Sequence, residues 1–302
     1  MIRHFSLILL AILAWNCAGA QNQVASDPDI ETLKAVQWDW HQVPSSQVES
    51  AWASVAVFGS TQSISLVRFP INRQTLSVVD AGGPAAEATS TLAKGESALA
   101  AINGSYFNMQ TLWPTTFLKD EGKVVCKSTE PEELRRCNGI ILMDDHKIDI
   151  LSLDTLAYKK ETEQWREAMV AGPVLIEEGK VLAYAPAIQK DEVGPEATII
   201  DNQYYKKFYE KRHPRTMVGY TADGWVYFIV VDGRFPEQGE GMKVSELQKL
   251  SVALGLYECL NLDGGGSSTL WVSGNGVLNH PYDNKIFDHE GERAVPNILI
   301  VK

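Results

Sequence analysis

The stretch TMVGYTADGWVYFIVV, residues 216–231, carries the pattern that decides the fold. Thr216–Thr221 and Trp225–Val231 are rich in β-branched and aromatic residues, which favour strands. Asp223-Gly224 between them is typical of the tight turn of a β-hairpin. The stretch therefore predicts two neighbouring antiparallel strands.

The same pattern recurs on both sides of this hairpin. Further β-rich runs bounded by turn residues occupy Trp52–Phe58 and Ser63–Phe69, Leu76–Val79, Thr115–Leu118 and Lys123–Cys126, Gly139–Met143 and Lys147–Leu153, and Val170–Glu177 and Val181–Tyr184. Helical patterns are fewer. One helix is expected from about Val244 to Leu254, with Ser245 and Gln248 as a capping box and Gly255 after its end, and a shorter one over Ser90–Leu99. The sequence predicts one α+β domain of mostly antiparallel or mixed β-sheet with a few packed helices.

The chain begins with a segment typical of export. Residues 1–20 run from a basic start through an apolar stretch to Ala18-Gly19-Ala20, which predicts a signal peptide and a periplasmic or secreted protein. Cys17 offers an alternative, a lipid-anchored N-terminus. The apolar stretch is shorter than a membrane-spanning helix needs, so no membrane span is expected. Residues 21–50 are expected to form an irregular N-terminal arm, and residues 51–302 the main domain, with an insertion at about 185–211.

Composition and cysteines narrow the function classes. Lys and Arg number 27 against 38 Asp and Glu, a net charge of −11, which disfavours a broad grip on nucleic acid. An exported protein is exposed to oxidising conditions, so Cys126 and Cys137 are candidates for a disulfide that closes a short loop. Cys259 lies in an apolar run and is expected to be a buried thiol. No cysteine pair has zinc-finger spacing.

One polar segment with three consecutive glycines stands out as a candidate site. In NLDGGGSST, residues 261–269, Asp263 follows an apolar strand, and Gly264, Gly265 and Gly266 allow the backbone to approach a ligand closely. Their N–H groups are expected to form an anion-binding nest, with the hydroxyls of Ser267 and Ser268 beside it. The alternative is that the glycines only make a turn.

Two further segments carry polar candidates. Asn103, Tyr106 and Asn108 lie in NGSYFN after a run of small residues, where they either bind a ligand or serve turn geometry. Arg215 and the Asp232-Gly233-Arg234 triplet flank the two strands of the central hairpin, so they are expected to meet at its open end. Two guanidinium groups there would hold a phosphate, or would form a surface ion-pair network with Asp232.

These segments occur in an order that resembles a known family. The set consists of INGSYFN at 102–108, AGPVLI at 171–176, HPRTMVGYT at 213–221, VVDGR at 230–234, SELQKLSVALGL at 245–256, NLDGGGSSTL at 261–270 and RAVPNILIV at 293–301. Together they resemble the phosphodiester glycosidase family over about residues 50–302. The N-terminal arm, the segment between Cys126 and Cys137 and the 185–211 insertion fall outside the resemblance.

The resemblance implies hydrolysis of a sugar 1-phosphodiester of the N-acetylglucosamine type, with a phosphomonoester as leaving group. A carboxylate near the anomeric carbon is then needed; Asp263 is the first candidate, followed by Asp232 and Glu246. Arg215, Arg234 and Gly264–Gly266 are expected to neutralise the phosphate. Asn103 and Asn108 are expected to bind sugar hydroxyls or the N-acetyl group, Tyr106 to stack on the ring, and Ser267 or Ser268 is a weaker nucleophile candidate.

No cofactor is expected to be required, although Asp263, Asp232 and Asn261 are hard oxygen donors suited to calcium or magnesium. The expected partner is a phosphorylated glycan or a sugar 1-phosphodiester. Two alternatives remain open at this point. One is a non-catalytic glycan-binding protein of the cell envelope, and the other is a phosphodiesterase that cuts the P–O bond of an exopolysaccharide or teichoic-acid-like polymer.

Overall fold

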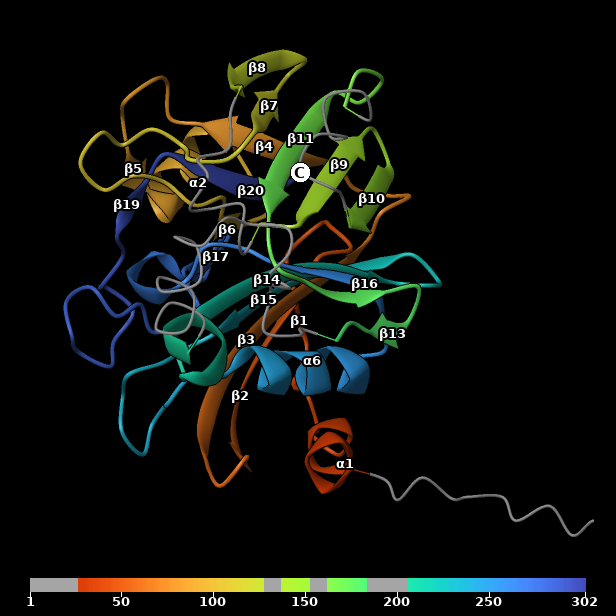
Figure 1. Ribbon diagram of the computed structural model, residues 1–302, viewed down its shortest axis with the longest axis vertical. Coiled ribbons are helices and arrows are strands. Elements are labelled where there is room, and N and C mark those ends of the chain that lie inside the picture. The colour runs from red at the N-terminus through yellow and green to blue at the C-terminus, as the bar shows by residue number, and fades with distance from the viewer. Residues whose placement is uncertain (1–26, 128–136, 153–161, 184–205) are drawn as a thin grey trace, which may run out of the picture.

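The computed structural model describes residues 27–127, 137–152, 162–183 and 206–302 (Figure 1). Its largest element is an eight-stranded sheet with neighbouring strands in the order β1-β2-β3-β15-β14-β16-β12-β13. These strands are β1 (His41–Gln42), β2 (Glu49–Val57), β3 (Ser60–Pro70), β15 (Trp225–Val231), β14 (Arg215–Thr221), β16 (Leu256–Asn261), β12 (Val174–Glu177) and β13 (Lys180–Val181). All of these neighbours pair antiparallel, and short connections join β1 to β2, β2 to β3, β14 to β15 and β12 to β13.

Two five-stranded sheets pack against the eight-stranded sheet. One has the order β10-β9-β11-β7-β8 and consists of β10 (Lys147–Ser152), β9 (Gly139–Asp144), β11 (Glu167–Ala171), β7 (Leu118–Asp120) and β8 (Lys123–Cys126). The other has the order β18-β17-β6-β20-β4 and consists of β18 (Gly276–Val277), β17 (Leu270–Val272), β6 (Ala100–Asn103), β20 (Asn297–Val301) and β4 (Leu76–Asp80). A two-stranded ribbon joins β19 (Ala294–Val295) to β5 (Glu87–Ala88).

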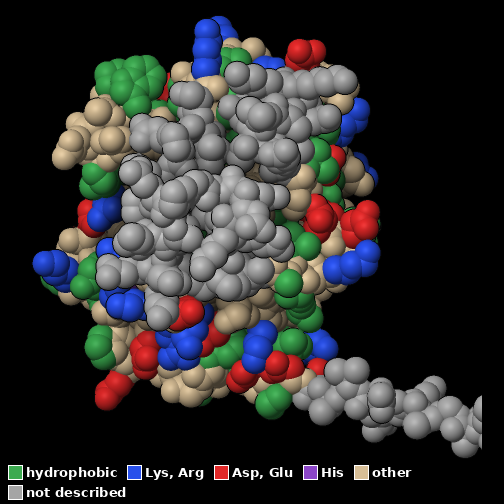
Figure 2. Space-filling model, viewed as in Figure 1, with side chains coloured by type: hydrophobic (Ala, Val, Ile, Leu, Met, Phe, Trp, Pro, Cys, Tyr) green, Lys and Arg blue, Asp and Glu red, His purple; other side chains and the backbone are tan. Residues whose placement is uncertain are grey.

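The core lies on both faces of the eight-stranded sheet. Phe69 and Phe228 point from one face towards the five-stranded sheets and pack edge to face, with ring centroids 5.4 Å apart. The other face is covered by α6 (Val244–Ala253), and α1 (Pro28–Lys34) packs next to α6 (Figure 1). The short helix α2 (Thr89–Gly95) packs against β6 and β20. Acidic and basic side chains are interspersed over the described surface in Figure 2.

The structure confirms the α+β class and the predicted hairpin turns. The run expected to be one strand over Val170–Glu177 is instead two strands, β11 and β12, which belong to different sheets, and only β12 pairs with β13. In the β14–β15 hairpin, Arg215 pairs with Val231 and Tyr220 with Val226 around Asp223-Gly224. The helix expected over Ser90–Leu99 is α2, which is shorter than predicted and begins one residue earlier.

The segment expected to be an irregular N-terminal arm is more ordered than the sequence suggested. It contains α1, whose first two N–H groups are capped by the Asp27 carboxylate and whose first residue is Pro28. Leu33 of this helix is buried against the core beside α6. Seven residues are too few to display a helical period, which is why the pattern was not visible in the sequence.

The start of α6 also differs from the prediction. The residue before the helix is Lys243, and its N–H donates to the carboxylate of Glu246 at 2.9 Å. Gln248 therefore does not belong to a capping box with Ser245; its amide instead donates to the carbonyl of Leu182 at 2.7 Å. The end of the helix agrees with the sequence, because Gly255 follows it with a φ of 73°.

The predicted disulfide is not present in the described structure. Cys126 ends β8, where its thiol donates a hydrogen bond to the carbonyl of Pro114 at 3.3 Å, and Cys137 is buried without being joined to it. Cys259 is a fully buried thiol, as expected, and burial raises its pKa to about 12. The predicted signal peptide at 1–20, Cys17, and residues 185–205 of the insertion lie outside the described residues.

Within the part of the chain that the structure describes, we find no helix whose length and apolar content would let it cross a bilayer.

Candidate active site

A cavity of about 270 Å³ lies at the open end of the β14–β15 hairpin. Its walls come from five segments that are far apart in the sequence: the loop after β6, the short helix η1 (Lys206–Glu210), the start of β14, and the loops after β15 and β16. The residues that line it are Tyr106, Lys207, Phe208, His213, Pro214, Arg215, Arg234, Asp263, Gly264 and Gly265. Six of these residues belong to the candidate site predicted from the sequence: Tyr106, Arg215, Arg234, Asp263, Gly264 and Gly265.

Backbone hydrogen bonds hold the loop after β16 against the start of β14. The N–H of Leu262 donates to the carbonyl of Thr216 at 2.8 Å, and the N–H of Gly265 donates to the carbonyl of Pro214 at 2.9 Å. A Cβ atom on Gly264 would lie 2.7 Å from the same Pro214 oxygen, a distance that side chains do not tolerate. Glycine at position 264 is therefore required for this close approach, which brings Asp263 to the cavity wall.

The glycines do not form the anion-binding nest that the sequence suggested. The N–H of Gly264 donates to the carboxylate of Asp263 at 2.8 Å, and the N–H of Gly265 is engaged by Pro214. Gly266 is buried beside Arg293 and Asp283 and is not among the residues that line the cavity. Two of the three expected N–H donors are thus used within the protein, and the glycines serve close packing and turn geometry.

Asp263 is partly exposed and lines the cavity as predicted. Its backbone is fixed on both sides, because its N–H donates to the carbonyl of Gly104 at 3.2 Å and its carbonyl accepts from the Asn103 amide at 2.8 Å. The Gly264 N–H orients its carboxylate. Among the residues that line the cavity, Asp263 is the one that carries a carboxylate.

Asn103 lies behind the cavity wall instead of contacting the cavity. Its side chain is fully buried, and its oxygen accepts from the Thr216 hydroxyl at 2.7 Å and from the Thr269 N–H at 3.2 Å. Together with its donation to Asp263, these bonds join the loops after β6 and β16 to β14. The predicted sugar contact does not fit this placement, since the amide groups are used within the protein.

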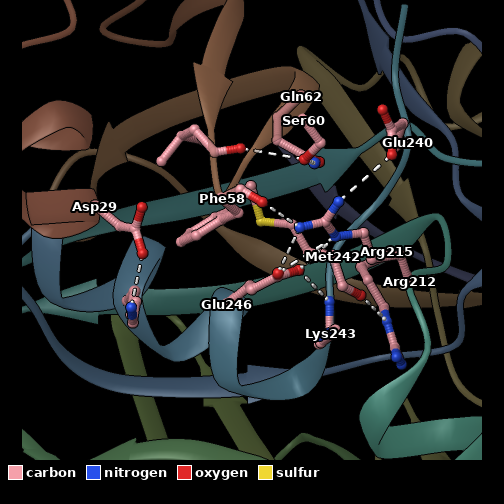
Figure 3. Close-up of polar contacts among 12 residues, drawn as sticks. Asp29, Phe58, Ser60, Gln62, Arg212, Arg215, Glu240, Met242, Lys243 and Glu246 are labelled. Atoms are coloured by element: carbon pink, nitrogen blue, oxygen red, sulfur yellow. Dashed lines mark hydrogen bonds and ion pairs between the residues drawn. The ribbon is translucent and has the colours of Figure 1, made fainter. Parts of the chain in front are cut away.

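Arg215 and Arg234 meet at the cavity, as the hairpin predicted. Arg215 is 3% exposed, and its Nε donates to the carbonyl of Met242 at 3.0 Å (Figure 3). A terminal nitrogen of Arg215 donates to the carbonyl of Phe208 at 2.5 Å and the group lies over the Phe208 ring, so η1 is held against β14. The guanidinium is therefore oriented rigidly.

Arg234 is held differently. It has a φ of 69°, and its guanidinium carbon lies 5.0 Å from the centre of the Tyr282 ring. Among the residues that the structure describes, no carboxylate lies within ion-pair distance of it. Partial burial lowers the pKa of Arg234, and the neighbouring positive charge of Arg293 lowers it further. A guanidinium in this environment favours an anionic ligand.

Tyr106 lines the cavity, but its hydroxyl is already engaged. The hydroxyl donates to the carbonyl of Gly172 at 2.8 Å and accepts from the Asn261 amide at 3.0 Å. These bonds fix the ring, and only the ring remains to contact a ligand. The predicted stacking role therefore stays a prediction, whereas a hydrogen bond from this hydroxyl to a ligand is not supported.

Four cavity residues were not assigned to the site from the sequence: Lys207, Phe208, His213 and Pro214. His213 and Pro214 lie in the HPRT segment, directly before Arg215, so this segment could have pointed to them. Lys207 and Phe208 belong to the insertion, where no pattern connected them to the site. The structure brings η1 to the cavity because its carbonyls accept hydrogen bonds from His213 and Arg215.

Asp232 is not among the residues that line the cavity. It is 1% exposed, and its carboxylate accepts hydrogen bonds from the hydroxyl of Ser63, the amide of Asn279 and the backbone N–H of His280. The Nδ1 atom of His280 lies 2.9 Å from the same carboxylate. Asp232 therefore joins β3, β15 and the loop after β18 in the interior.

Glu246 also lies away from the cavity. Its carboxylate accepts hydrogen bonds from Arg212 at 2.8 Å and from the N–H of Lys243, at the first turn of α6 (Figure 3). Asn108 makes a turn in which its side-chain oxygen accepts from the N–H groups of Gln110 and Thr111. Ser267 and Ser268 are buried, and neither hydroxyl lines the cavity.

The described residues contain no group of three or more His, Cys, Asp or Glu side chains arranged to hold a metal ion. In particular, Asp232 and Asp263 do not share a site, so the donor set suggested for calcium or magnesium is not assembled.

Some known proteins are similar to part of this sequence, and others are similar to its fold. The chain is similar to YomE, an uncharacterised protein derived from the SPbeta prophage of Bacillus subtilis (strain 168). The two sequences are 36% identical over 90 residues, which cover 30% of this chain and 13% of YomE. A hypothetical protein from Synechocystis has a similar structure, with a TM-score of 0.66 and 14% identity over 88% of this chain and 64% of that one. The chain thus spans less than two thirds of the length of either relative.

Two further structures are similar. The catalytic domain of zebrafish N-acetylglucosamine-1-phosphodiester alpha-N-acetylglucosaminidase, auto-inhibited by its pro-peptide, matches with a TM-score of 0.63 and 20% identity over 88% of both chains. A putative exported protein from Burkholderia pseudomallei K96243 matches with a TM-score of 0.59 and 16% identity over 80% of this chain and 74% of that one. Residues 96–302, well over half of the sequence, match the family described as phosphodiester glycosidase, and the chain therefore belongs to the phosphodiester glycosidase family.

Proposed function

We propose that this protein is a glycoside hydrolase that cleaves a sugar 1-phosphodiester into a free sugar and a phosphomonoester. The observation that carries the proposal is the joint placement of one carboxylate, Asp263, and two guanidinium groups, Arg215 and Arg234, on the walls of one cavity. Family membership supports the reaction class. The substrate to test first is the N-acetylglucosamine 1-phosphodiester type, which is the one named for the zebrafish relative.

In the proposed reaction, the guanidinium groups bind the phosphate and the carboxylate acts at the anomeric carbon. A phosphodiester presents only hydrogen-bond acceptors and a negative charge, which guanidinium groups match. Cleavage of the anomeric C–O bond leaves an additional negative charge on the phosphate, and Arg215 and Arg234 stabilise that charge as it develops. Because a phosphate is a good leaving group, the reaction depends less on a strong general acid.

Asp263 supplies the carboxylate that an oxocarbenium-like transition state requires. In the proposed mechanism it either activates a water molecule or attacks the anomeric carbon. The Gly264 N–H holds one carboxylate oxygen at 2.8 Å, which fixes the orientation of the group before the substrate binds. No cofactor is required in this scheme.

The test is the release of N-acetylglucosamine from an α-linked N-acetylglucosamine 1-phosphodiester by the purified protein, with and without chelator. Asp263→Asn keeps an oxygen that accepts from Gly264 but removes the charge, and it is expected to lower turnover at least a thousandfold without loss of folding. Asp39→Asn is the matched control, because this side chain is 86% exposed. Normal turnover in Asp263→Asn would refute the assignment.

Hydrolysis in ¹⁸O-labelled water identifies the bond that breaks. Label in the sugar means C–O cleavage, as proposed, and label in the phosphate means that the protein is a phosphodiesterase. Failure of the wild type to act on any sugar 1-phosphodiester would favour a glycan-binding protein instead.

We also propose that the protein is exported and processed after Ala20. N-terminal sequencing of protein from the exported fraction is expected to start at Gln21. A start at a lipid-modified Cys17 would show that the chain is anchored to a membrane instead.

A further inference from the structure

His213 is a cavity residue whose hydrogen-bonding state the structure determines. Its Nε2 atom lies 2.7 Å from the carbonyl oxygen of Lys207. A carbonyl oxygen can only accept, so Nε2 must carry the hydrogen in this contact. In the neutral imidazole, Nδ1 is then the atom with a free lone pair. Among the described residues, no donor is within hydrogen-bond distance of Nδ1.

The surroundings of His213 keep the imidazole neutral. Lys207 faces it from η1, Arg215 from β14, Arg234 from the loop after β15, and Asp263 lines the same cavity from the loop after β16. Burial lowers the pKa of His213, and the positive charges of Arg215 and Arg234 lower it further; together they outweigh the hydrogen bond to the Lys207 carbonyl, which acts in the opposite direction. At neutral pH the ring therefore offers an acceptor at Nδ1 instead of a second donor.

An acceptor is scarce in this cavity. Arg215, Arg234 and Lys207 are donors, and they match the acceptor oxygens of a phosphodiester. The hydroxyl of Tyr106 donates to Gly172 and already accepts from Asn261. Of the ionisable side chains on the walls, Asp263 and His213 remain as acceptors, and Asp263 is assigned to the anomeric centre.

We propose that Nδ1 of His213 accepts a hydrogen bond from one hydroxyl group of the substrate sugar and thereby selects that sugar. The hydroxyl groups of a sugar donate as well as accept hydrogen bonds, whereas the phosphodiester only accepts them. The sugar therefore needs an acceptor on the protein, and Nδ1 of His213 supplies it. The inference rests on the proposed function, since it names the part of the substrate that this side of the cavity recognises.

Two substitutions separate the proposed contact with the sugar from the contact with Lys207, because each retains the hydrogen-bonding function of only one imidazole nitrogen. His213→Gln places an amide nitrogen near the position of Nε2 and retains donation to Lys207, but it has no acceptor at the position of Nδ1. His213→Asn places an oxygen near the position of Nδ1 and loses the Lys207 contact. Both are assayed on the parent sugar 1-phosphodiester and on a series of its monodeoxy analogues.

The expected result is a matched loss. The wild type loses about tenfold in kcat/KM on one deoxy analogue, as expected for one ordinary hydrogen bond. Relative to the wild type, His213→Gln has a kcat/KM about tenfold lower on the parent substrate and unchanged on that analogue, which already lacks the hydroxyl group. On each of the other analogues, kcat/KM of His213→Gln is lower than that of the wild type by the same factor as on the parent. His213→Asn keeps most of the parent kcat/KM while its Tm falls.

The pH profile provides a second readout. Protonation of Nδ1 removes the acceptor, so kcat/KM of the wild type on the parent substrate falls at acidic pH. The same acidic fall is expected to be weaker in His213→Asn, whose amide oxygen does not titrate in this range.

Other outcomes overturn the inference. His213 does not select the sugar if kcat/KM of His213→Gln equals that of the wild type on the parent substrate. The same conclusion follows if His213→Gln lowers kcat/KM by one factor on every analogue, including the analogue that the wild type discriminates against. It also follows if His213→Gln and His213→Asn lower kcat/KM on the parent equally. If the wild type turns over no sugar 1-phosphodiester at all, the proposed function fails. That failure is distinguishable from failure of the His213 inference, because it is seen in the wild type before any variant is compared.

Discussion

Glu246 and Arg212 connect the first turn of α6 to the segment before β14. Nη2 of Arg212 lies 2.8 Å from Oε1 of Glu246, and Nε lies 3.1 Å from Oε2 (Figure 3). The Glu246 side chain is 10% exposed and the Arg212 side chain 21%, so water screens this pair only partly. The carboxylate raises the pKa of Arg212 and keeps it charged. Because His213 directly follows Arg212 and Arg215 lies three positions after it, the pair positions the cavity wall that this segment forms.

Glu246→Gln tests this positioning role. The amide still accepts from the Lys243 N–H, but the ion pair is lost, so the free energy of unfolding is expected to fall by about 1–3 kcal/mol. The kcat/KM value is expected to stay within about tenfold of the wild type, measured below the melting transition. Ser245→Ala is the neighbouring control at an exposed position and should change neither quantity. A thousandfold loss of turnover with unchanged stability would instead make Glu246 a catalytic residue.

Gly265→Ala is expected to disturb both the backbone and Arg234. Gly265 has a φ of 66°, and a Cβ atom there would lie 3.1 Å from Nη2 of Arg234. The backbone strain is expected to cost about 1 kcal/mol of stability, and displacement of the guanidinium should raise KM several-fold for an anionic substrate. Gly59→Ala is the matched control, since Gly59 also has a φ of 66° but no atom within 4 Å of the added carbon. Equal KM values in the two variants would show that Gly265 does not set the position of Arg234.

Asp232→Asn is expected to lower stability more than activity. The buried carboxylate accepts from Ser63, Asn279 and two nitrogens of His280, and an amide cannot satisfy all four donors. We expect a loss of about 3 kcal/mol in the free energy of unfolding by urea titration. Turnover of the folded variant at low temperature should remain within about tenfold. Full stability combined with abolished turnover would restore Asp232 as a catalytic candidate.

Glu258 predicts how stability depends on pH. It is 5% exposed, and burial, aided by the charges of Glu177 and Asp149, raises its pKa to about 7. A glutamate in the unfolded chain has a pKa of about 4.3, so between these two values the folded protein binds more protons than the unfolded one. The contribution of Glu258 to stability is therefore lost as pH rises from about 4.3 to about 7.

Glu258→Gln removes this dependence. The variant is expected to be more stable than the wild type by about 1–3 kcal/mol at pH 8 and nearly equal to it at pH 4, as measured by denaturant unfolding at both pH values. Glu87→Gln, at an exposed position of β5, should show no such difference. A Glu258→Gln variant that is less stable than the wild type at pH 8 would show that the ionised carboxylate contributes favourably to the fold.

Local patterns in the sequence were sufficient for most of the strands, for the hairpin turns and for the family. Alternating and β-branched runs with Asp-Gly turns specify antiparallel neighbours, because turn type and strand propensity depend on adjacent residues. The meeting of Arg215 and Arg234 also followed from the sequence, since both ends of one hairpin must lie together. Asp263 was identified because an acidic residue between an apolar strand and three glycines is an unusual combination.

Only the tertiary structure decided which of the candidate residues share the cavity. Asp232, like Asp263, comes soon after a strand and directly before a glycine, and Glu246 lies in the first turn of α6. The loop after β18 and the segment before β14 provide other partners for these two carboxylates. Asn103 is turned inwards to join three segments, while His213 and Lys207 come to the cavity wall. Hydrogen bonds such as these, between residues 34 to 113 positions apart, leave no local periodicity in the sequence. The sequence by itself determined most of the strands, the hairpins and the family, and long-range packing decided which side chains face the cavity.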